Sequence, residues 1–98
     1  MMKEFILFVH GDATLPESDG AWEAYFERLH RSGQFDGGSS IGEGKTFRKG
    51  DAVGAPATSL VGFLRIRAAD AAEAETFLVG NPVFESGGTV EIKELLRD

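Results

Sequence analysis

Five consecutive apolar residues, Phe5–Val9, follow a polar start and end at a histidine, a glycine and an aspartate. A run of this length that is rich in aromatic and β-branched residues, and is closed by turn-forming residues, predicts a β-strand. A strand with one face in water alternates apolar with polar side chains, but this run is apolar on both faces. We therefore expect a central strand that is covered on both sides.

The same run is too short to span a bilayer, which takes about 20 residues. No small-residue cleavage site of a signal peptide follows it. The chain also lacks cysteine, which excludes disulfides, thiolate nucleophiles and cysteine-ligated zinc. We therefore expect a cytoplasmic protein without a membrane partner.

A first amphipathic helix is indicated by apolar residues at helical spacing. Its apolar stripe consists of Trp22, Tyr25, Phe26 and Leu29. We expect its N-terminal cap from Thr14 with Glu17, or from Ser18 alone. Gly33 supplies the left-handed residue that ends such a helix.

A second helix is predicted to begin at Asp70, where Glu73 completes a capping pattern, and to stop at Gly80 and Pro82. Asn81 lies between these two stop residues, and asparagine tolerates left-handed geometry. A helix stop explains Asn81 structurally. The alternative is that its amide binds a ligand in a cleft.

Two further segments, Leu60–Arg67 and Thr89–Leu95, have strand patterns. Residues 36–57 are rich in glycine, and within them we predict a strand at Lys45–Arg48 and a loop or hairpin end at Gly50–Ala57. The order β-α-β-β-α-β predicts one α+β domain over residues 1–98, a ferredoxin-like βαββαβ sandwich of the dimeric α+β barrel type.

Two helices cover only one face of such a sheet. The other face must carry Phe8 or Leu7, and Phe63 or Leu64. An apolar patch of that kind is unusual on a monomer, and two sheets that pair across a twofold axis would bury it. We therefore expect a homodimer. The alternative, a loop from residues 36–57 that covers the face within one chain, stays open.

The chain carries a formal net charge of −6. An acidic surface repels phosphate backbones, so nucleic acid is not an expected partner. Lys45, Arg48 and Lys49 form a local basic exception, which Glu43 and Asp51 flank. A solvated hairpin explains this cluster.

His10 and Asp12 lie at the end of the first strand, where clefts in such sheets open, and they are the candidate catalytic pair. The structural alternative is a strand-end histidine bonded to backbone beside a turn-forming aspartate. Arg65, with Arg67 two residues on, is the candidate anion-binding residue. Its alternative is a cross-strand pair with Glu91.

Neither a metal nor a bound cofactor is expected. The chain has two histidines, His10 and His30, which lie far apart in the sequence without a clear third ligand. The glycine-rich segment 37–44 matches neither the P-loop pattern nor the dinucleotide-binding pattern.

Several segments, in order and spacing, suggest a family. They are Lys3–Val9 followed by Gly11-Asp12, Gly33–Gly38, Leu60–Ile66, an Asp-led helix, Asn81-Pro82 and Gly88–Leu95. Together they resemble the YCII-related (DGPF-domain) proteins over nearly the whole chain. The resemblance implies a dimeric ferredoxin-like fold with a cleft between sheets and helices, and an enzymatic role argued from a His–Asp pair in that cleft.

The family's pair is not retained in this chain. The histidine position falls near Ala21 and Trp22, and the aspartate position matches Asn81. An amide does not take up a proton as a carboxylate does. The region that corresponds to the Asp-Gly-Pro-Phe tetrapeptide reads Gly50-Asp51-Ala52-Val53.

Three functions therefore stand as hypotheses. The first is a YCII-related homodimer of unknown reaction that binds a small molecule in a cleft, with an enzyme as one form of it. The second is a noncatalytic accessory or interaction module, which the loss of the pair favours. The third is a cofactor-free monooxygenase of the dimeric α+β barrel type, which requires a large apolar cavity inside each subunit.

Overall fold

The computed structural model describes residues 1–50 and 59–97. Its elements follow the predicted β-α-β-β-α-β order, with a 3₁₀ turn and a short third helix before the last strand. They are β1 (Lys3–His10), α1 (Ala21–Ser32), β2 (Phe35–Ser40), β3 (Leu60–Ala68), α2 (Ala71–Glu75), η1 (Thr76–Leu78), α3 (Pro82–Glu85) and β4 (Val90–Leu95). The loop predicted at Gly50–Ala57 lies outside the described residues except for its first residue, and so does Asp51.

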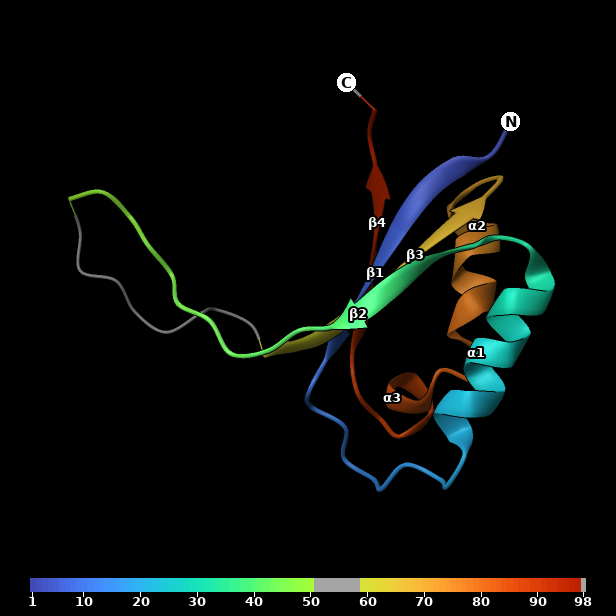
Figure 1. The fold of residues 1–98 in the computed structure, drawn as a ribbon, viewed down its shortest axis with the longest axis horizontal. Helices are drawn as coiled ribbons and strands as arrows, with labels where there is room; N and C mark the ends of the chain where they lie inside the picture. Colours follow the sequence, from blue (N-terminus) through green and yellow to red (C-terminus); the bar gives the residue numbers. More distant parts are fainter. Residues whose placement is uncertain (51–58, 98) are drawn as a thin grey trace.

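The four strands form one antiparallel sheet in the order β2-β3-β1-β4. The strands β1 and β3 are central, and Leu7 on β1 lies opposite both Leu64 on β3 and Ile92 on β4. This order belongs to the split βαβ arrangement. The predicted α+β, ferredoxin-like fold is therefore confirmed (Figure 1).

The helices lie on one side of the sheet, which we call the inner face (Figure 1). Alternate residues of β1 and β3 point toward them and form the core with side chains from the helical layer. The buried core residues are Phe5, Leu7, Val9, Tyr25, Leu29, Leu64, Ile66, Ala68, Ala74, Phe77 and Val83. Burial of each large side chain in this set stabilises the fold by about 1.5–3 kcal/mol.

The opposite side of the sheet, the outer face, has no helix over it in the described part of the chain (Figure 1). Ile6, Phe8 and Phe63 lie at its centre and are only half-buried, and Phe8 is directly opposite Phe63. Charged residues flank them, with Arg65 and Lys93 on either side of Ile6. Of the two alternatives for each strand, the phenylalanines therefore lie on the outer face and the leucines on the inner face.

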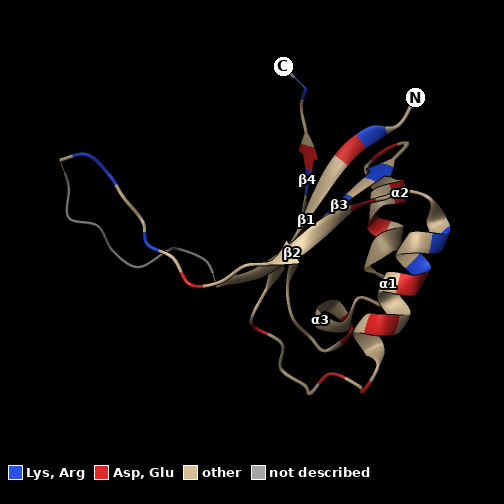
Figure 2. Cartoon of the chain, viewed as in Figure 1, with Lys and Arg blue, Asp and Glu red and all other residues tan. Residues whose placement is uncertain are grey.

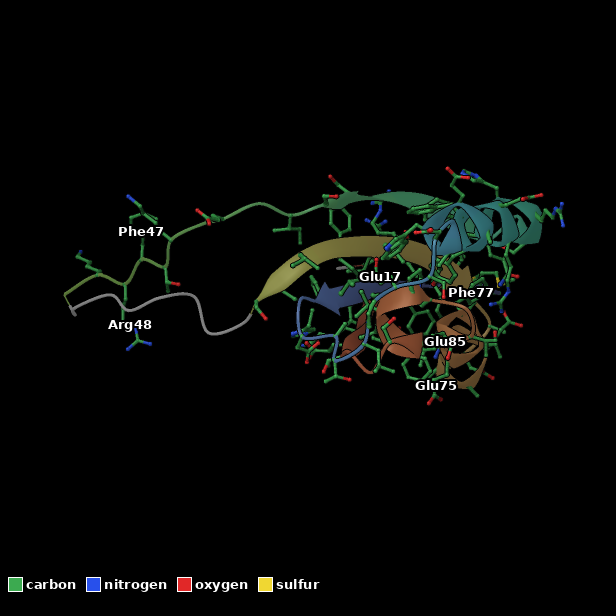
Figure 3. All side chains as sticks on the ribbon, turned by 90° about the horizontal axis from the view of Figure 1, so that it is seen from below. Glu17, Phe47, Arg48, Glu75, Phe77 and Glu85 are labelled. Atoms are coloured by element: carbon green, nitrogen blue, oxygen red, sulfur yellow. The ribbon has the colours of Figure 1, made fainter. Side chains whose placement is uncertain are left out.

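Residues 41–50 continue from the end of β2 and project away from the sheet, on the side opposite to the helices (Figure 1). We call residues 41–50 the arm. Phe47 lies far out on it and is 83% exposed (Figure 3). The arm therefore does not fold over the apolar centre of the outer face, so this half of the predicted loop does not supply the missing cover.

The second strand lies earlier in the chain than predicted. Lys45–Arg48 has no regular structure, and β2 instead occupies Phe35–Ser40. Gly37 adopts a φ of 100° where the pairing is irregular. Gly38 lies so close to β3 that a Cβ there would be 2.2 Å from the carbonyl oxygen of Phe63. Glycine is a poor strand former, but close pairing with a neighbouring strand overrides local propensity.

The start of α1 also differs from the prediction. The helix begins after Gly20, which has a left-handed φ of 73° and gives no side-chain cap. The predicted caps were Thr14 with Glu17, and Ser18. Thr14 instead bonds to the end of α3, where its backbone N–H donates to the carbonyl oxygen of Ser86 over 2.9 Å. Gly33, with a φ of 71°, ends the helix as predicted.

The cap of α2 is confirmed, because Asp70 accepts a hydrogen bond of 2.8 Å from the backbone N–H of Glu73. The left-handed residue after the following turn is Gly80, with a φ of 83°. Asn81 is extended, with φ −65° and ψ 120°, and it caps α3. The reason is Pro82, because a proline forces the preceding residue into the extended region and is well suited to the first position of a helix.

Candidate functional site

A cavity of about 280 Å³ opens between α1 and the part of the sheet formed by β2 and β3. The helix supplies Trp22 and Phe26, whose spacing of four residues places them on the same side of α1. The strands supply the rest of the lining. The lining residues are Val9, Trp22, Phe26, Gly38, Ser39, Ser40, Val61, Gly62, Phe63 and Leu64.

Two glycines lie on the sheet side of this cavity. Gly62 on β3 lies opposite Val9, and Gly38 on β2 lies opposite Leu64. A Cβ at Gly38 would lie 2.2 Å from the carbonyl oxygen of Phe63, and one at Gly62 would lie 3.2 Å from that of Ser39. Glycine at both positions therefore lets β2 and β3 approach each other closely. Glycine at a strand position often marks a place where a ligand or another backbone comes close. Because neither glycine has a side chain, backbone atoms form this part of the sheet side of the cavity.

An aromatic wall forms the helix side of the cavity. The rings of Trp22 and Phe26 are stacked, with centroids 5.5 Å apart and an angle of 29° between their planes. The indole N–H of Trp22 donates to Oε1 of Glu17 over 3.1 Å, and Glu17 lies on the loop before α1 (Figure 3). This bond orients the indole and leaves its ring surface for packing.

The side chains that line the cavity, all within the described residues, carry no charge at neutral pH. Ser39 and Ser40 are the hydroxyl-bearing residues in that lining. Ser40 lies opposite Gly62, on the inner face, whereas Ser39 lies opposite Phe63 and its hydroxyl donates to the carbonyl oxygen of Ser40 over 2.9 Å. The hydroxyl on the cavity side is therefore that of Ser40, which can donate or accept a hydrogen bond. The lining can therefore bind an apolar molecule with a polar group, but it supplies no acid or base for proton transfer.

A wider hollow of about 660 Å³ adjoins this cavity at the base of the arm. The two share Val61, and the hollow is otherwise lined by residues 41–45, Ser59 and Leu60. Glu43 and Lys45 belong to this second lining. Charged groups thus lie on the arm side of Val61, outside the aromatic-walled cavity.

His10 lies at the end of β1, beside Glu91 of β4. Its Nε2 is 3.8 Å from Oε1 of Glu91, and the imidazole side chain is 15% exposed. Within residues 1–50 and 59–97, this nitrogen has no hydrogen-bond partner. Glu91 lies on the outer face, opposite Phe8. A histidine–glutamate pair thus replaces the predicted histidine–aspartate pair at this strand end.

Asp12 is engaged in a structural contact. Its Oδ1 accepts from the backbone N–H of Thr89 over 2.8 Å, and its Oδ2 accepts from the hydroxyl of Thr89 over 2.6 Å. The hydroxyl bond is the main cause that holds the pKa of Asp12 below its usual value, and the backbone bond adds to it. This carboxylate ties the end of β1 to the start of β4.

Asn81 is fully buried in the helical layer. Its Oδ1 accepts from the backbone N–H groups of Val83 and Phe84, each over 3.1 Å. Tyr25 is close by and donates its hydroxyl to the carbonyl oxygen of Phe77 over 2.7 Å. Burial raises the pKa of Tyr25, and the nearby Asn81 amide partly offsets this rise. Asn81 thus holds α3 in place.

Arg65 lies on the outer face and donates to the carbonyl oxygen of Asp36 over 3.2 Å. Arg67 pairs with the carboxylate of the same aspartate, with its Nε 3.0 Å from both oxygens. The alternative pair with Glu91 is not formed, because β1 lies between β3 and β4 in the sheet. Both arginines instead hold the β2 edge against β3.

The structure does not bring the four predicted site residues together. His10 and Arg65 are associated with the outer face, Asp12 bonds to Thr89, and Asn81 is in the helical layer. The lining of the cavity includes none of them. The sequence placed Trp22 in the apolar stripe of the first helix, and only the register of β2 with β3, which sets Gly38 opposite Leu64 and Ser40 opposite Gly62, could have marked it as a cavity wall.

The described residues contain neither a metal-binding cluster nor a membrane-spanning helix. No group of three or more histidine, aspartate or glutamate side chains is arranged to hold a metal ion. None of the helices in residues 1–50 and 59–97 has the length and apolar character that a bilayer crossing requires.

Comparison with known proteins assigns the chain to no family. A scan against protein-family models finds no match for the chain, and a search of curated proteins finds no relative. The resemblance to the YCII-related proteins therefore stays a prediction, and the function is argued from the geometry.

Proposed function

We propose that the protein is a YCII-like homodimer that binds a small molecule in the cavity between α1 and the β2–β3 edge. The cavity itself carries the binding proposal, since it has a volume of about 280 Å³, an aromatic wall and the serine Ser40 at its sheet side. Sites for small molecules are concave and mostly apolar, with a few polar groups that orient the ligand. The cavity has each of these properties.

The homodimer is supported by the outer face. Ile6, Phe8 and Phe63 are only half-buried there, although they lie at the centre of the sheet. Apolar patches on a sheet face mark interaction sites. The same face carries Arg65 and Glu91, so a second copy turned by a twofold axis offers charges of both signs to it.

The arm supports a second copy as the occupant of that face. It contains three basic residues and one acidic residue, a net charge of +2, so the rest of the chain carries −8 within the total of −6. Figure 2 shows basic residues along the arm, acidic residues on the loop before α1, and both acidic and basic residues on the helices. Because the arm projects on the outer-face side, it would meet the acidic body of a copy that is seated there.

Binding is favoured over catalysis by the composition of the lining. His10 and Asp12 are absent from it, and its polar side chains are serines. Serine requires an activating base to act as a nucleophile, and the lining of described residues contains no such base. A noncatalytic binding module accounts for this cavity without further groups.

A cofactor-free monooxygenase is the second candidate. Such an enzyme requires an apolar cavity within each subunit, and the cavity beneath α1 is mostly apolar and lies within one chain. Such an enzyme would insert one oxygen atom of O₂ into the substrate and release the other as water, with electrons from the substrate. Oxygen uptake with a dihydroxynaphthalene is the direct test. Uptake no faster than without protein would exclude this candidate for that substrate class.

The binding proposal is tested with the protein's own fluorescence, because Trp22 is the single tryptophan of the chain and lines the cavity. We expect a saturable change of its emission, with one site per chain, for at least one member of a panel of neutral, anionic and cationic small molecules. A panel that leaves the emission unchanged, and gives no heat on titration, contradicts the proposal.

The homodimer is tested by sedimentation velocity at micromolar concentration. We expect a species of twice the chain mass of 10.6 kDa. A single species with the mass of one chain would contradict the dimer and leave the cavity proposal intact.

A further inference from the structure

We propose that the ligand of the cavity is an uncharged molecule with a planar, mostly apolar system of one or two fused rings and one hydrogen-bonding group at its edge. This inference rests on the proposed binding function and specifies its ligand class. Its grounds are the charge of the lining, the shape of the two walls, the volume and the position of a serine hydroxyl.

The absence of charge in the ligand follows from the lining. Its ten residues, all described, are aliphatic, aromatic, glycine or serine. The carboxylate near the wall, Glu17, already accepts the indole N–H of Trp22 over 3.1 Å. A charged group in this cavity would lose its hydration without gaining a counter-charge, which is costly. An uncharged ligand avoids that cost.

The planar shape follows from the two sides of the cavity. On the helix side, the rings of Trp22 and Phe26 are stacked with 29° between their planes. On the sheet side, Gly38 and Gly62 expose backbone in place of side chains. A space between aromatic rings and a glycine surface fits a flat molecule, which packs against aromatic rings by offset stacking.

The size follows from the volume of about 280 Å³. An engineered apolar cavity of about 150 Å³ takes up benzene, so this cavity has room for two fused rings. The polar edge follows from Ser40, which lines the cavity and lies opposite Gly62 on the inner face. A serine hydroxyl both donates and accepts, and a ligand hydroxyl is the complementary group.

The first test compares two probes that share rings and differ in charge, 2-naphthol and 2-naphthoate, by calorimetry and Trp22 emission at pH 7. We expect 2-naphthol to bind with a Kd at least tenfold lower than that of 2-naphthoate. Equal or tighter binding of the carboxylate would overturn the ligand class. If neither these probes nor any other member of the panel binds, the proposed function itself fails, which is a distinct result.

The second test places a charge at the cavity. Val61 lines the cavity and is 43% exposed, and Val79 is 61% exposed and lies outside the lining. We expect Val61→Asp to raise the Kd for 2-naphthol at least tenfold, and Val79→Asp to change it less than twofold. Thermal melting of both variants checks that each is folded. Equal effects of the two substitutions would overturn the assignment of the ligand to this cavity.

Discussion

Alternate residues of the same strands form the two faces of the sheet, and only one face is covered within the chain. On β1, Leu7 is 0% exposed under the helices, whereas its neighbour Phe8 is half-buried on the outer face. Both side chains are large and apolar. The difference shows that an apolar strand pattern indicates which faces of a sheet must be covered. It does not show whether the same chain or a second copy covers them.

The comparison separates two kinds of stability. Removal of inner-face packing should weaken the folding of each chain, because a cavity replaces buried contacts. Removal of outer-face side chains should weaken association between copies far more than folding, because their remaining surface is buried only by the proposed partner. The expected effects below run from the largest to the smallest.

Leu7→Ala should lower the free energy of unfolding by about 3 kcal/mol, since truncation of a fully buried leucine costs about 2–5 kcal/mol. Urea unfolding at a fixed protein concentration measures this loss. Ile6→Ala on the outer face is the matched control and should cost less than half as much. Equal losses of unfolding free energy in the two variants would contradict the distinction between the two faces.

Phe8→Ser should raise the dimer dissociation constant at least tenfold, because it places a hydroxyl where the proposed interface is apolar. Sedimentation equilibrium over a range of concentrations measures the constant. Phe84→Ser is the control, since Phe84 is 43% exposed on α3, away from the outer face. If Phe8→Ser left the association unchanged, or Phe84→Ser weakened it as much, the outer face would not be the interface.

Phe47→Ala should raise the same dissociation constant by about threefold and leave the unfolding of the single chain unchanged. Its ring is 83% exposed on the arm, so folding gains little from it. Leu96→Ala, at a leucine that is 73% exposed near the C-terminus, is the control for loss of an exposed apolar side chain. If both changes gave the same association constant as the unchanged chain, the arm would play no part in pairing.

Much of the fold could be predicted because it depends on local patterns. The apolar runs of β1 and β3, the alternation in β4, the stripe on α1 and the cap at Asp70 each recur in the structure. The position of β2 could not, because its glycine-rich sequence forms a strand only when β3 lies beside it. The short helix α3 has four residues, too few for a periodic signal, so Asn81 did not show as a cap.

The candidate site was less predictable than the fold. Trp22 and Phe26 belong to the expected apolar stripe, and a stripe does not show which part of it faces a cavity. That depends on Gly38 and Gly62, which come under the helix only through the register of β2 with β3. Register is a property of paired strands, so the cavity had no signal within any single segment.

Asp12→Asn should have the smallest effect on stability among these substitutions. It should change neither the packing of the inner face nor the association through the outer face. The bonds from Thr89 lower the pKa of Asp12 from its ordinary value of 3.8, so they stabilise the folded chain while the carboxylate is ionised. That contribution is complete above the ordinary pKa and is lost as the pH falls through the lowered pKa of the folded state. Because this carboxylate is exposed to solvent, we expect a small loss of Tm at pH 7.

The pH dependence of Tm distinguishes a carboxylate that joins two strands from one that acts in a functional site. The difference in Tm between Asp12→Asn and the unchanged chain should shrink as the pH falls below the ordinary pKa of 3.8 and through the lowered pKa of the folded state, where Asp12 takes up a proton and becomes uncharged like asparagine. Dimer association and 2-naphthol binding, both measured at pH 7, should stay within twofold of their unchanged values, because Asp12 contacts Thr89 and does not line the cavity. A large loss of ligand binding in Asp12→Asn, with an unchanged Tm, would instead move the functional site to the end of β1 beside His10.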